Sequence, residues 1–148
     1  MFNLRAVASL LLFCLMLGGS AQVAAAVDKP FADAKVVLQI SDMDPSKQTL
    51  VLNVAGNLLK HYGPDRVDVE VVAFGPGLRL LYADNANKER IATLAQNGVR
   101  FSACGNTIAN YTKLLGAAPE INPIATVVPG GIVRIVDLVK AGYVLDKP

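Results

Sequence analysis

The residue of this sequence that is best suited to covalent chemistry is Cys104. It stands in the segment Cys104-Gly105-Asn106-Thr107, between a predicted strand over 99–102 and a predicted helix over 107–115. With Asn106 as the expected N-cap, the sulfur would lie near the unpaired N–H groups of a helix N-terminus, which favour thiolate over thiol. A single thiolate suits a persulfide carrier, a mixed-disulfide partner or a nucleophile. The competing interpretation is a packed cysteine that acts only as a small apolar residue.

Other chemistries lack the residues that they need. The sequence holds two cysteines and one histidine, and Cys14 falls within the leader described below. The one remaining thiol excludes an internal disulfide framework, a C-x-x-C dithiol reaction and a cysteine-rich zinc site. His61 falls at the far end of a predicted helix over 46–62, so we expect a surface residue and no Cys–His dyad. We therefore expect no metal and no cofactor.

The first 26 residues have the pattern of a secretory signal peptide. A short basic start ending at Arg5 precedes an apolar run over 6–17, and the small residues over 21–26 end in an A-x-A pattern. The apolar run is shorter than the roughly 20 residues that a membrane-spanning helix needs. Cleavage predicts a periplasmic or extracellular protein, and an uncleaved anchor is the alternative. Residues 27–34 are expected to form a short polar tail before a single domain over 35–148.

Composition limits the classes of partner. The chain of 148 residues is 53% hydrophobic, and much of that apolar content lies in the leader. Its 14 basic and 12 acidic residues leave a net charge of +2. This balance provides no basic footprint for nucleic acid and no polybasic patch for a membrane surface. A small, nearly neutral domain rich in valine and leucine also predicts self-association.

Beyond the tail, strand and helix patterns alternate along the chain. The expected strands are 36–40, 67–74, 99–102, 124–128 and 143–145. The expected helices are 46–62, 87–97, 107–115 and a last one between Gly131 and Gly142, each closed by a glycine. Strands alternating with helices in this way predict an α/β fold with a mostly parallel sheet of about five strands, covered on both faces.

Two of these helices have expected core faces. In the first helix, Asp44 is the expected N-cap and Pro45 the first helical residue. Its predicted apolar stripe comprises Leu50, Val51, Val54, Leu58 and Tyr62. The residues predicted to point inward from the last helix are Ile132, Ile135, Val136 and Val139.

A parallel sheet also predicts where a site lies. The loops that follow its strands gather at the carboxyl edge, where helix N-termini point. The residues expected to bind substrate there, around a catalytic Cys104, are Gly105, Asn106, Thr107, Ser41, Asp42, Gly75 and Gly130. Tight turns are the competing interpretation of Gly75 and Gly130, since neither belongs to a complete phosphate-binding motif. Turn formation and capping likewise account for Asp42 without chemistry.

Several segments, taken in order, resemble the DsrE/DsrF-like proteins. They are the Ser41-Asp42 turn, Asn57 before His61-Tyr62-Gly63, Ala73-Phe74-Gly75-Pro76-Gly77, the segment from Gly98 to Thr107, and Gly142-Tyr143. The resemblance covers residues 35–148 and implies a three-layer α/β/α sandwich that assembles into homo-oligomers, often trimers or hexamers. It also implies a sulfur-relay role, in which the loop cysteine carries a persulfide between a donor and an acceptor protein.

Cys104 stands at the position of that loop cysteine. The resemblance therefore implies a sulfur carrier with sulfurtransferase-like activity at Cys104, and the predicted leader implies that this carrier is exported. The alternative is a non-catalytic oligomeric binding module in which Cys104 is a packed core residue.

Overall fold

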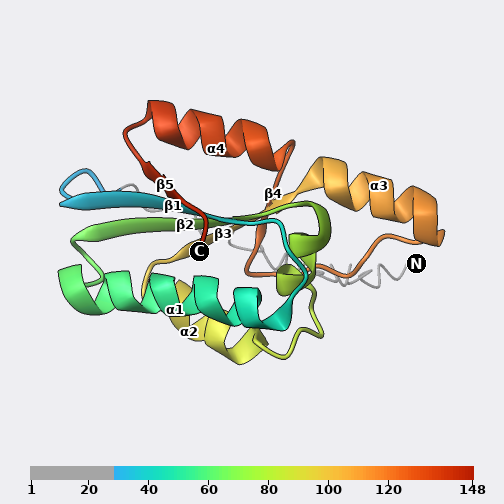
Figure 1. Cartoon of the computed structure of the whole chain (residues 1–148), viewed down its shortest axis with the longest axis horizontal. Helices are drawn as coiled ribbons and strands as arrows, with labels where there is room; N and C mark the ends of the chain where they lie inside the picture. Colours follow the sequence, from blue (N-terminus) through green and yellow to red (C-terminus); the bar gives the residue numbers. More distant parts are fainter. Residues whose placement is uncertain (1–28) are drawn as a thin grey trace, which may run out of the picture.

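The computed structural model describes residues 29–148, which form a five-stranded, all-parallel sheet with helices on both faces (Figure 1). The predicted signal peptide lies outside the described residues. The strands are β1 (Ala34–Ile40), β2 (Val67–Ala73), β3 (Arg100–Cys104), β4 (Thr126–Val128) and β5 (Val144–Asp146). Their order across the sheet is β4-β3-β2-β1-β5. The predicted α/β class and its parallel sheet are confirmed.

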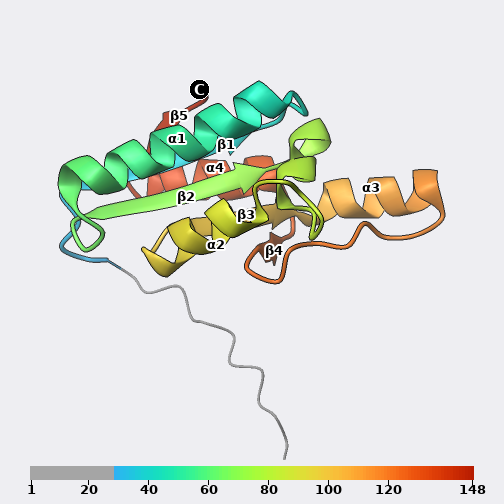
Figure 2. The same cartoon turned by 90° about the horizontal axis from the view of Figure 1, so that it is seen from below.

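The helices are divided between the two faces of the sheet. They are α1 (Pro45–Tyr62), α2 (Lys88–Gln96), α3 (Gly105–Leu115) and α4 (Gly131–Lys140), with a 3-10 helix, η1 (Gly75–Leu81). In Figure 1, α1 and α2 lie below the sheet and α4 lies above it. Figure 2 shows that α3 runs outward beyond the carboxyl ends of the strands. The sequence pattern predicted no helix at η1, because its glycines and proline indicate a turn.

Local signals set the ends of α1. The Ser46 N–H donates to Asp44 Oδ1 at 2.8 Å, and Pro45 occupies the first turn, which confirms both predictions. Gly63 ends the helix with φ +87°, a conformation that residues with a side chain rarely adopt. The predicted apolar stripe is wrong at Leu50 and Tyr62, which are exposed. The buried side of α1 carries Gln48, Val51, Leu52 and Ala55 instead.

The predicted inward face of α4 is correct only at Ile135. Ile135 and Leu138 are buried against the sheet, whereas Ile132, Val136 and Val139 are exposed. Apolar residues occupy more than one side of this helix, so periodicity alone did not define the side that contacts the sheet.

The core is unequal on the two faces. Alternate side chains of β2 point to opposite faces, as in any strand. On the α1 and α2 face, the apolar side chains of β1, β2 and β3 join those of α1, η1 and α2 in one large cluster. The cluster on the α4 face is smaller and consists of Val37, Val72, Ile135, Leu138 and Tyr143, with Phe74 packed against it.

Residues 29–33, which belong to the predicted polar tail, are attached to the domain. The Asp33 N–H donates to the Arg66 carbonyl at 2.7 Å, and Lys29 Nζ donates to the carbonyls of Pro64 and Val67 at 2.6 and 3.0 Å. None of the helices between residues 29 and 148 has the length and apolar character needed to cross a membrane.

Candidate functional site

Cys104 lies at the junction of β3 and α3. It is the last residue of β3 and the N-cap of α3, with extended backbone angles of φ −72° and ψ 113°. The prediction of Asn106 as N-cap is wrong, because the helix already begins at Gly105. A Cβ at Gly105 would lie 3.0 Å from the Val128 carbonyl oxygen. The missing side chain therefore lets the first turn of α3 pack closely against the end of β4.

The N-terminus of α4 also reaches the sulfur. The backbone N–H of Gly131, the first residue of α4, donates to Cys104 Sγ with an N···S distance of 3.1 Å. Cys104 also occupies the N-cap position of α3. Two helix N-termini therefore converge on one sulfur atom, and each contributes partial positive charge and unpaired N–H groups.

Thr107, in the first turn of α3, is placed to donate a further hydrogen bond to the sulfur. Its hydroxyl oxygen accepts the Gly75 N–H at 2.9 Å, so the hydroxyl proton remains available for Cys104. Thr107 thus connects the loop after β2 to the thiol at the end of β3. A hydroxyl can accept one hydrogen bond and donate another, so Thr107 can bond Gly75 and Cys104 at the same time.

These contacts change the acidity of the thiol. Burial raises the pKa of Cys104, but hydrogen bonds from the Thr107 side chain and from the N–H groups of Gly131, Thr107 and Asn106 outweigh burial and lower the pKa below its ordinary value. The Asn106 N–H contributes least, and it also donates to the Pro129 carbonyl at 3.2 Å. The hydrogen-bonding environment therefore favours a thiolate at Cys104.

Cys104 is nevertheless buried, with 5% of its surface exposed. The sulfur-carrier hypothesis expected an exposed thiol, and this expectation is wrong for the described residues 29–148. The start of α4 reaches the sulfur through Gly131, and a Cβ at Gly131 would lie 2.9 Å from Phe74 Cβ. Only a glycine allows the start of α4 to approach Phe74 this closely.

The structure brings most of the predicted binding residues to Cys104. Gly105 follows it directly, Thr107 and Gly75 are hydrogen-bonded to each other, and a Cβ at Gly130 would lie 3.4 Å from Asn106 Nδ2. These five residues lie at the starts of η1, α3 and α4, which follow the neighbouring strands β2, β3 and β4.

Ser41 and Asp42 are not among the residues that contact Cys104, although Ser41 lies against η1, where a Cβ at Gly77 would be 2.7 Å from Ser41 Cα. They follow β1, which β2 separates from β3. Asp42 forms an ion pair with Lys47 at 2.7 Å and accepts the Asp44 N–H at 2.9 Å. Hydrogen bonds to Lys47 and Asp44 lower the pKa of Asp42, in line with its role in the turn before α1. The turn interpretation therefore fits Asp42 better than substrate binding does.

A buried ionic cluster, which was not predicted from the sequence, lies on the α4 face. Glu70 of β2 has 1% of its side chain exposed. Its carboxylate accepts hydrogen bonds from Nε and Nη2 of Arg134, each with an N···O distance of 2.7 Å. Ser102 Oγ donates to the same carboxylate at 2.6 Å. Burial raises the pKa of Glu70, but the bonds from Arg134 and Ser102 and the charge of Arg100 outweigh burial and lower the pKa.

The other half of this cluster surrounds Asp68. Tyr143 donates to Asp68 Oδ2 and accepts from Arg100 Nη2 at 2.8 Å. Arg100 Nη2 also lies 3.0 Å from Asp68 Oδ1, although without the geometry of a hydrogen bond. Acidic residues at alternate positions of a strand expected inside a sheet covered on both faces were the signal that could have revealed this cluster.

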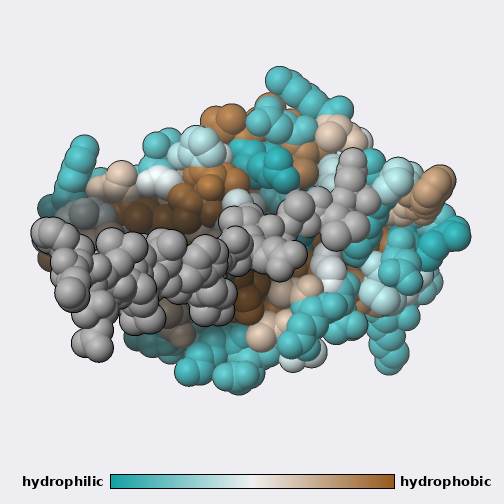
Figure 3. All heavy atoms as spheres, turned by 180° about the vertical axis from the view of Figure 1, so that it is seen from behind, coloured by the Kyte–Doolittle hydropathy of each residue, from teal (hydrophilic) through white to brown (hydrophobic). Residues whose placement is uncertain are grey.

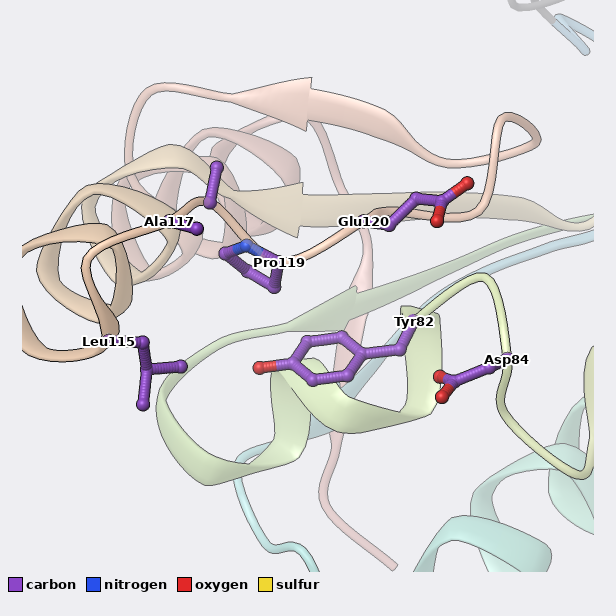
Figure 4. Close-up of a pocket in the computed structure, with 7 residues that line it drawn as sticks. Tyr82, Asp84, Leu115, Ala117, Pro119 and Glu120 are labelled. Carbon is purple, nitrogen blue, oxygen red and sulfur yellow. The ribbon is translucent and has the colours of Figure 1, made fainter.

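An open hollow lies at the opposite end of α3 from Cys104. It has a volume of about 380 Å³ and is lined by Tyr82, Asp84, Leu115, Ala117, Ala118, Pro119 and Glu120. The Tyr82 ring points toward Pro119 and Leu115, and the carboxylates of Asp84 and Glu120 lie on the other side (Figure 4). None of the predicted site residues lines this hollow.

Together, the fold and the site define an α/β protein with a cysteine at the carboxyl edge of a parallel sheet. No family model and no curated protein matches the chain. Among solved structures, it is similar to a protein of unknown function, MTH1491 from Methanobacterium thermoautotrophicum, with 29% sequence identity and a TM-score of 0.70. That likeness covers 78% of this chain and all of the other. It supports the fold and leaves the function to be argued from the site.

Proposed function

We propose that the protein is an exported sulfur carrier of the DsrE/DsrF-like kind, with Cys104 holding sulfane sulfur as a persulfide. The observation that carries this proposal is the hydrogen bond from the Gly131 N–H to Cys104 Sγ, at the point where α3 and α4 both begin. A sulfur atom in this position is stabilised as an anion without a neighbouring base. His61, which lies in the last turn of α1, has no part in this mechanism.

Sulfur transfer at this site balances without an external oxidant. The Cys104 thiolate attacks the outer sulfur of a donor persulfide, R–S–SH, and forms a new S–S bond. The S–S bond of the donor breaks, and its electron pair leaves with the donor as R–S⁻. The products are the Cys104 persulfide and the donor thiolate. Delivery is the same exchange in reverse, with an acceptor thiolate attacking the outer sulfur.

The groups around the sulfur stabilise negative charge at both stages. The Gly131 N–H and the Thr107 hydroxyl stabilise the attacking thiolate. When the acceptor removes the outer sulfur, the same donors stabilise the Cys104 thiolate as the leaving group. Because Cys104 is 5% exposed, uptake of an additional sulfur atom requires its surroundings to open.

The proposal includes self-association, as a trimer or hexamer, through the outer side of α4 and the adjacent edge strand β5. Large apolar side chains on these two elements are exposed: Ile132, Val133, Val136, Val139, Val144 and Leu145. Seen from behind, apolar side chains also gather near α4 at the upper side of the molecule (Figure 3). Burying such side chains between subunits is favourable by about 25 cal/mol per Å².

The low exposure of Cys104 favours a second candidate function, the non-catalytic oligomeric binding module. In this alternative, Cys104 packs as a small apolar residue, and the loops at the carboxyl edge hold a small ligand or a partner. The two functions differ in one property, which is whether the folded protein accepts sulfur at Cys104.

Intact mass after incubation with polysulfide tests the proposal. We expect the folded protein with Cys14→Ser to gain the mass of whole sulfur atoms, and a reductant to remove them. The matched control, Cys14→Ser with Cys104→Ser, should gain none. If Cys104 reacts only after denaturation, the carrier proposal fails and the binding module replaces it.

A further inference from the structure

We propose that Glu70 and Arg134 are a positioning pair that holds the start of α4 on the sulfur of Cys104. The inference rests on the proposed function, because it concerns the thiolate used there. Neither residue contacts the sulfur, so the pair acts through the position of the Gly131 N–H.

The first turn of α4 lacks a side-chain cap. Its N-cap is Gly130, which has no side chain to bond the free N–H groups. The first helical hydrogen bond runs from the Arg134 N–H to the Gly130 carbonyl at 3.0 Å. Arg134 therefore closes the same turn whose Gly131 N–H points at the sulfur, and a movement of Arg134 moves Gly131 with it.

Glu70 fixes that turn to the sheet. Its two carboxylate oxygens each accept one Arg134 nitrogen at 2.7 Å, and this fork restricts rotation as well as distance. The Ser102 hydroxyl donates to Glu70 Oε1 at 2.6 Å from β3, two residues before Cys104. One buried carboxylate thus connects α4, β2 and the strand that carries the thiol.

Charge alone predicts the opposite effect from positioning. Replacing Glu70 by Gln removes a negative charge near the thiolate and leaves Arg134 without its anionic partner. Both changes would stabilise a thiolate and lower the pKa of Cys104. Loss of the Gly131 hydrogen bond would raise this pKa. The other charged groups of the cluster, Asp68 and Arg100, are the same in both variants described below.

The test is the pH midpoint of Cys104 ionisation in the full chain with Cys14→Ser. It is followed by the ultraviolet absorbance of the thiolate, as the difference from the same chain with Cys104→Ser, because this readout needs no access to the buried sulfur. We expect Glu70→Gln to raise this midpoint and to lower the acid dissociation constant of Cys104 by about fivefold, the size expected for one lost hydrogen bond. Arg134→Lys keeps the positive charge but loses the two-pronged hydrogen bond to Glu70. If the pair acts by positioning α4, the midpoint should rise; if it acts only through charge, the midpoint should not change. The control is Arg66→Lys, which breaks a similar fork to Asp33 (2.8 and 2.6 Å) remote from the sulfur and should leave the midpoint unchanged.

An unchanged or lowered midpoint in a folded variant overturns the proposal. If Glu70→Gln does not fold, as judged by circular dichroism, Arg134→Lys decides the question, because the Arg134 side chain is 35% exposed and tolerates replacement. The midpoint does not depend on sulfur uptake. A wild type that accepts no sulfur would refute the carrier function and still leave the positioning pair open to this test.

Discussion

On the face of the sheet covered by α1 and α2, β2 contributes Val67, Val69, Val71 and Ala73 to one large apolar cluster. On the face covered by α4, the same strand contributes Asp68 and Glu70, with Val72 in a small cluster. Cys104 and its hydrogen bond from α4 belong to this second face. The comparison indicates that one face supplies most of the apolar stabilisation, whereas the other uses specific polar contacts to place α4 over the thiol.

The largest effect should come from the apolar face. Phe101 is 2% exposed in the large cluster, and Phe101→Ala should lower the free energy of unfolding by about 3–5 kcal/mol through lost burial and a cavity. Leu138→Ala, in the smaller cluster beneath α4, should cost about 2 kcal/mol, the low end for such changes. Chemical denaturation measures the unfolding free energy of both variants. If Phe101→Ala and Leu138→Ala lose the same amount, the apolar face does not supply most of the stability.

The ionic cluster should contribute less to stability than Phe101 does, but by an amount that can be measured. Glu70→Gln weakens the bonds to Arg134 and should cost about 1.5–3 kcal/mol, typical of hydrogen bonds to a charged group. Denaturation at neutral pH measures the loss. A variant as stable as the wild type would show that the cluster adds no stability to this face.

Acid should act through the same carboxylate. The pKa of Glu70 is lower in the folded state than its ordinary value of 4.5, so its contribution is present above that pH and disappears as the pH falls through the folded value. We expect the unfolding free energy to fall on acidification below about pH 4.5. The fall should be shallower in Glu70→Gln. Parallel pH profiles for the two proteins would contradict this assignment.

A smaller change separates the sulfur contact from general helix stability. Thr107→Val removes the hydroxyl that accepts the Gly75 N–H and donates to Cys104, so it should cost about 1 kcal/mol and raise the pKa of Cys104. Thr112→Val removes a hydroxyl bonded to the Ile108 carbonyl one turn further along α3. This control should leave the pKa of the thiol unchanged. A shift of equal size in both variants would show that the hydroxyl of Thr107 has no special role.

The smallest effect on monomer stability should come from the outer side of α4. Val136 is 44% exposed, so Val136→Asp should change the unfolding free energy by no more than about 0.5 kcal/mol. It should nevertheless dissociate the proposed oligomer, because it places a charge within an apolar interface. Sedimentation velocity would show this, with Asn110→Asp on the exposed side of α3 as control. A wild type that sediments only as a monomer at micromolar concentration would rule out self-association.

The sequence predicted the fold better than the site, for a physical reason. Glycines, proline and β-branched runs act locally, so the expected strands, the Asp44 cap and the end of α1 at Gly63 agree with the structure. The inward side of α4 and the start of α3 at Gly105 depend on contacts with elements distant in sequence. Periodicity does not contain that information.

The same limit applies to the residues around the thiol. The sequence placed Gly75, Gly130 and Thr107 at the same edge as Cys104, because the topology of a parallel sheet requires it. It did not predict that Gly131 would donate to the sulfur, or that Glu70 would be buried and paired with Arg134. Those contacts depend on how far α4 approaches the sheet, which only the packed structure determines.

The most direct test of the central claim is the acidity of Cys104 in the folded wild-type site. The pH dependence of alkylation would be measured with Cys14→Ser, first in buffer and then in denaturant. We expect a lower midpoint in the folded protein, because the hydrogen bonds from Thr107 and Gly131 outweigh the cost of burial. A folded midpoint equal to or above the denatured one would contradict a stabilised thiolate, and with it the sulfur-carrier function.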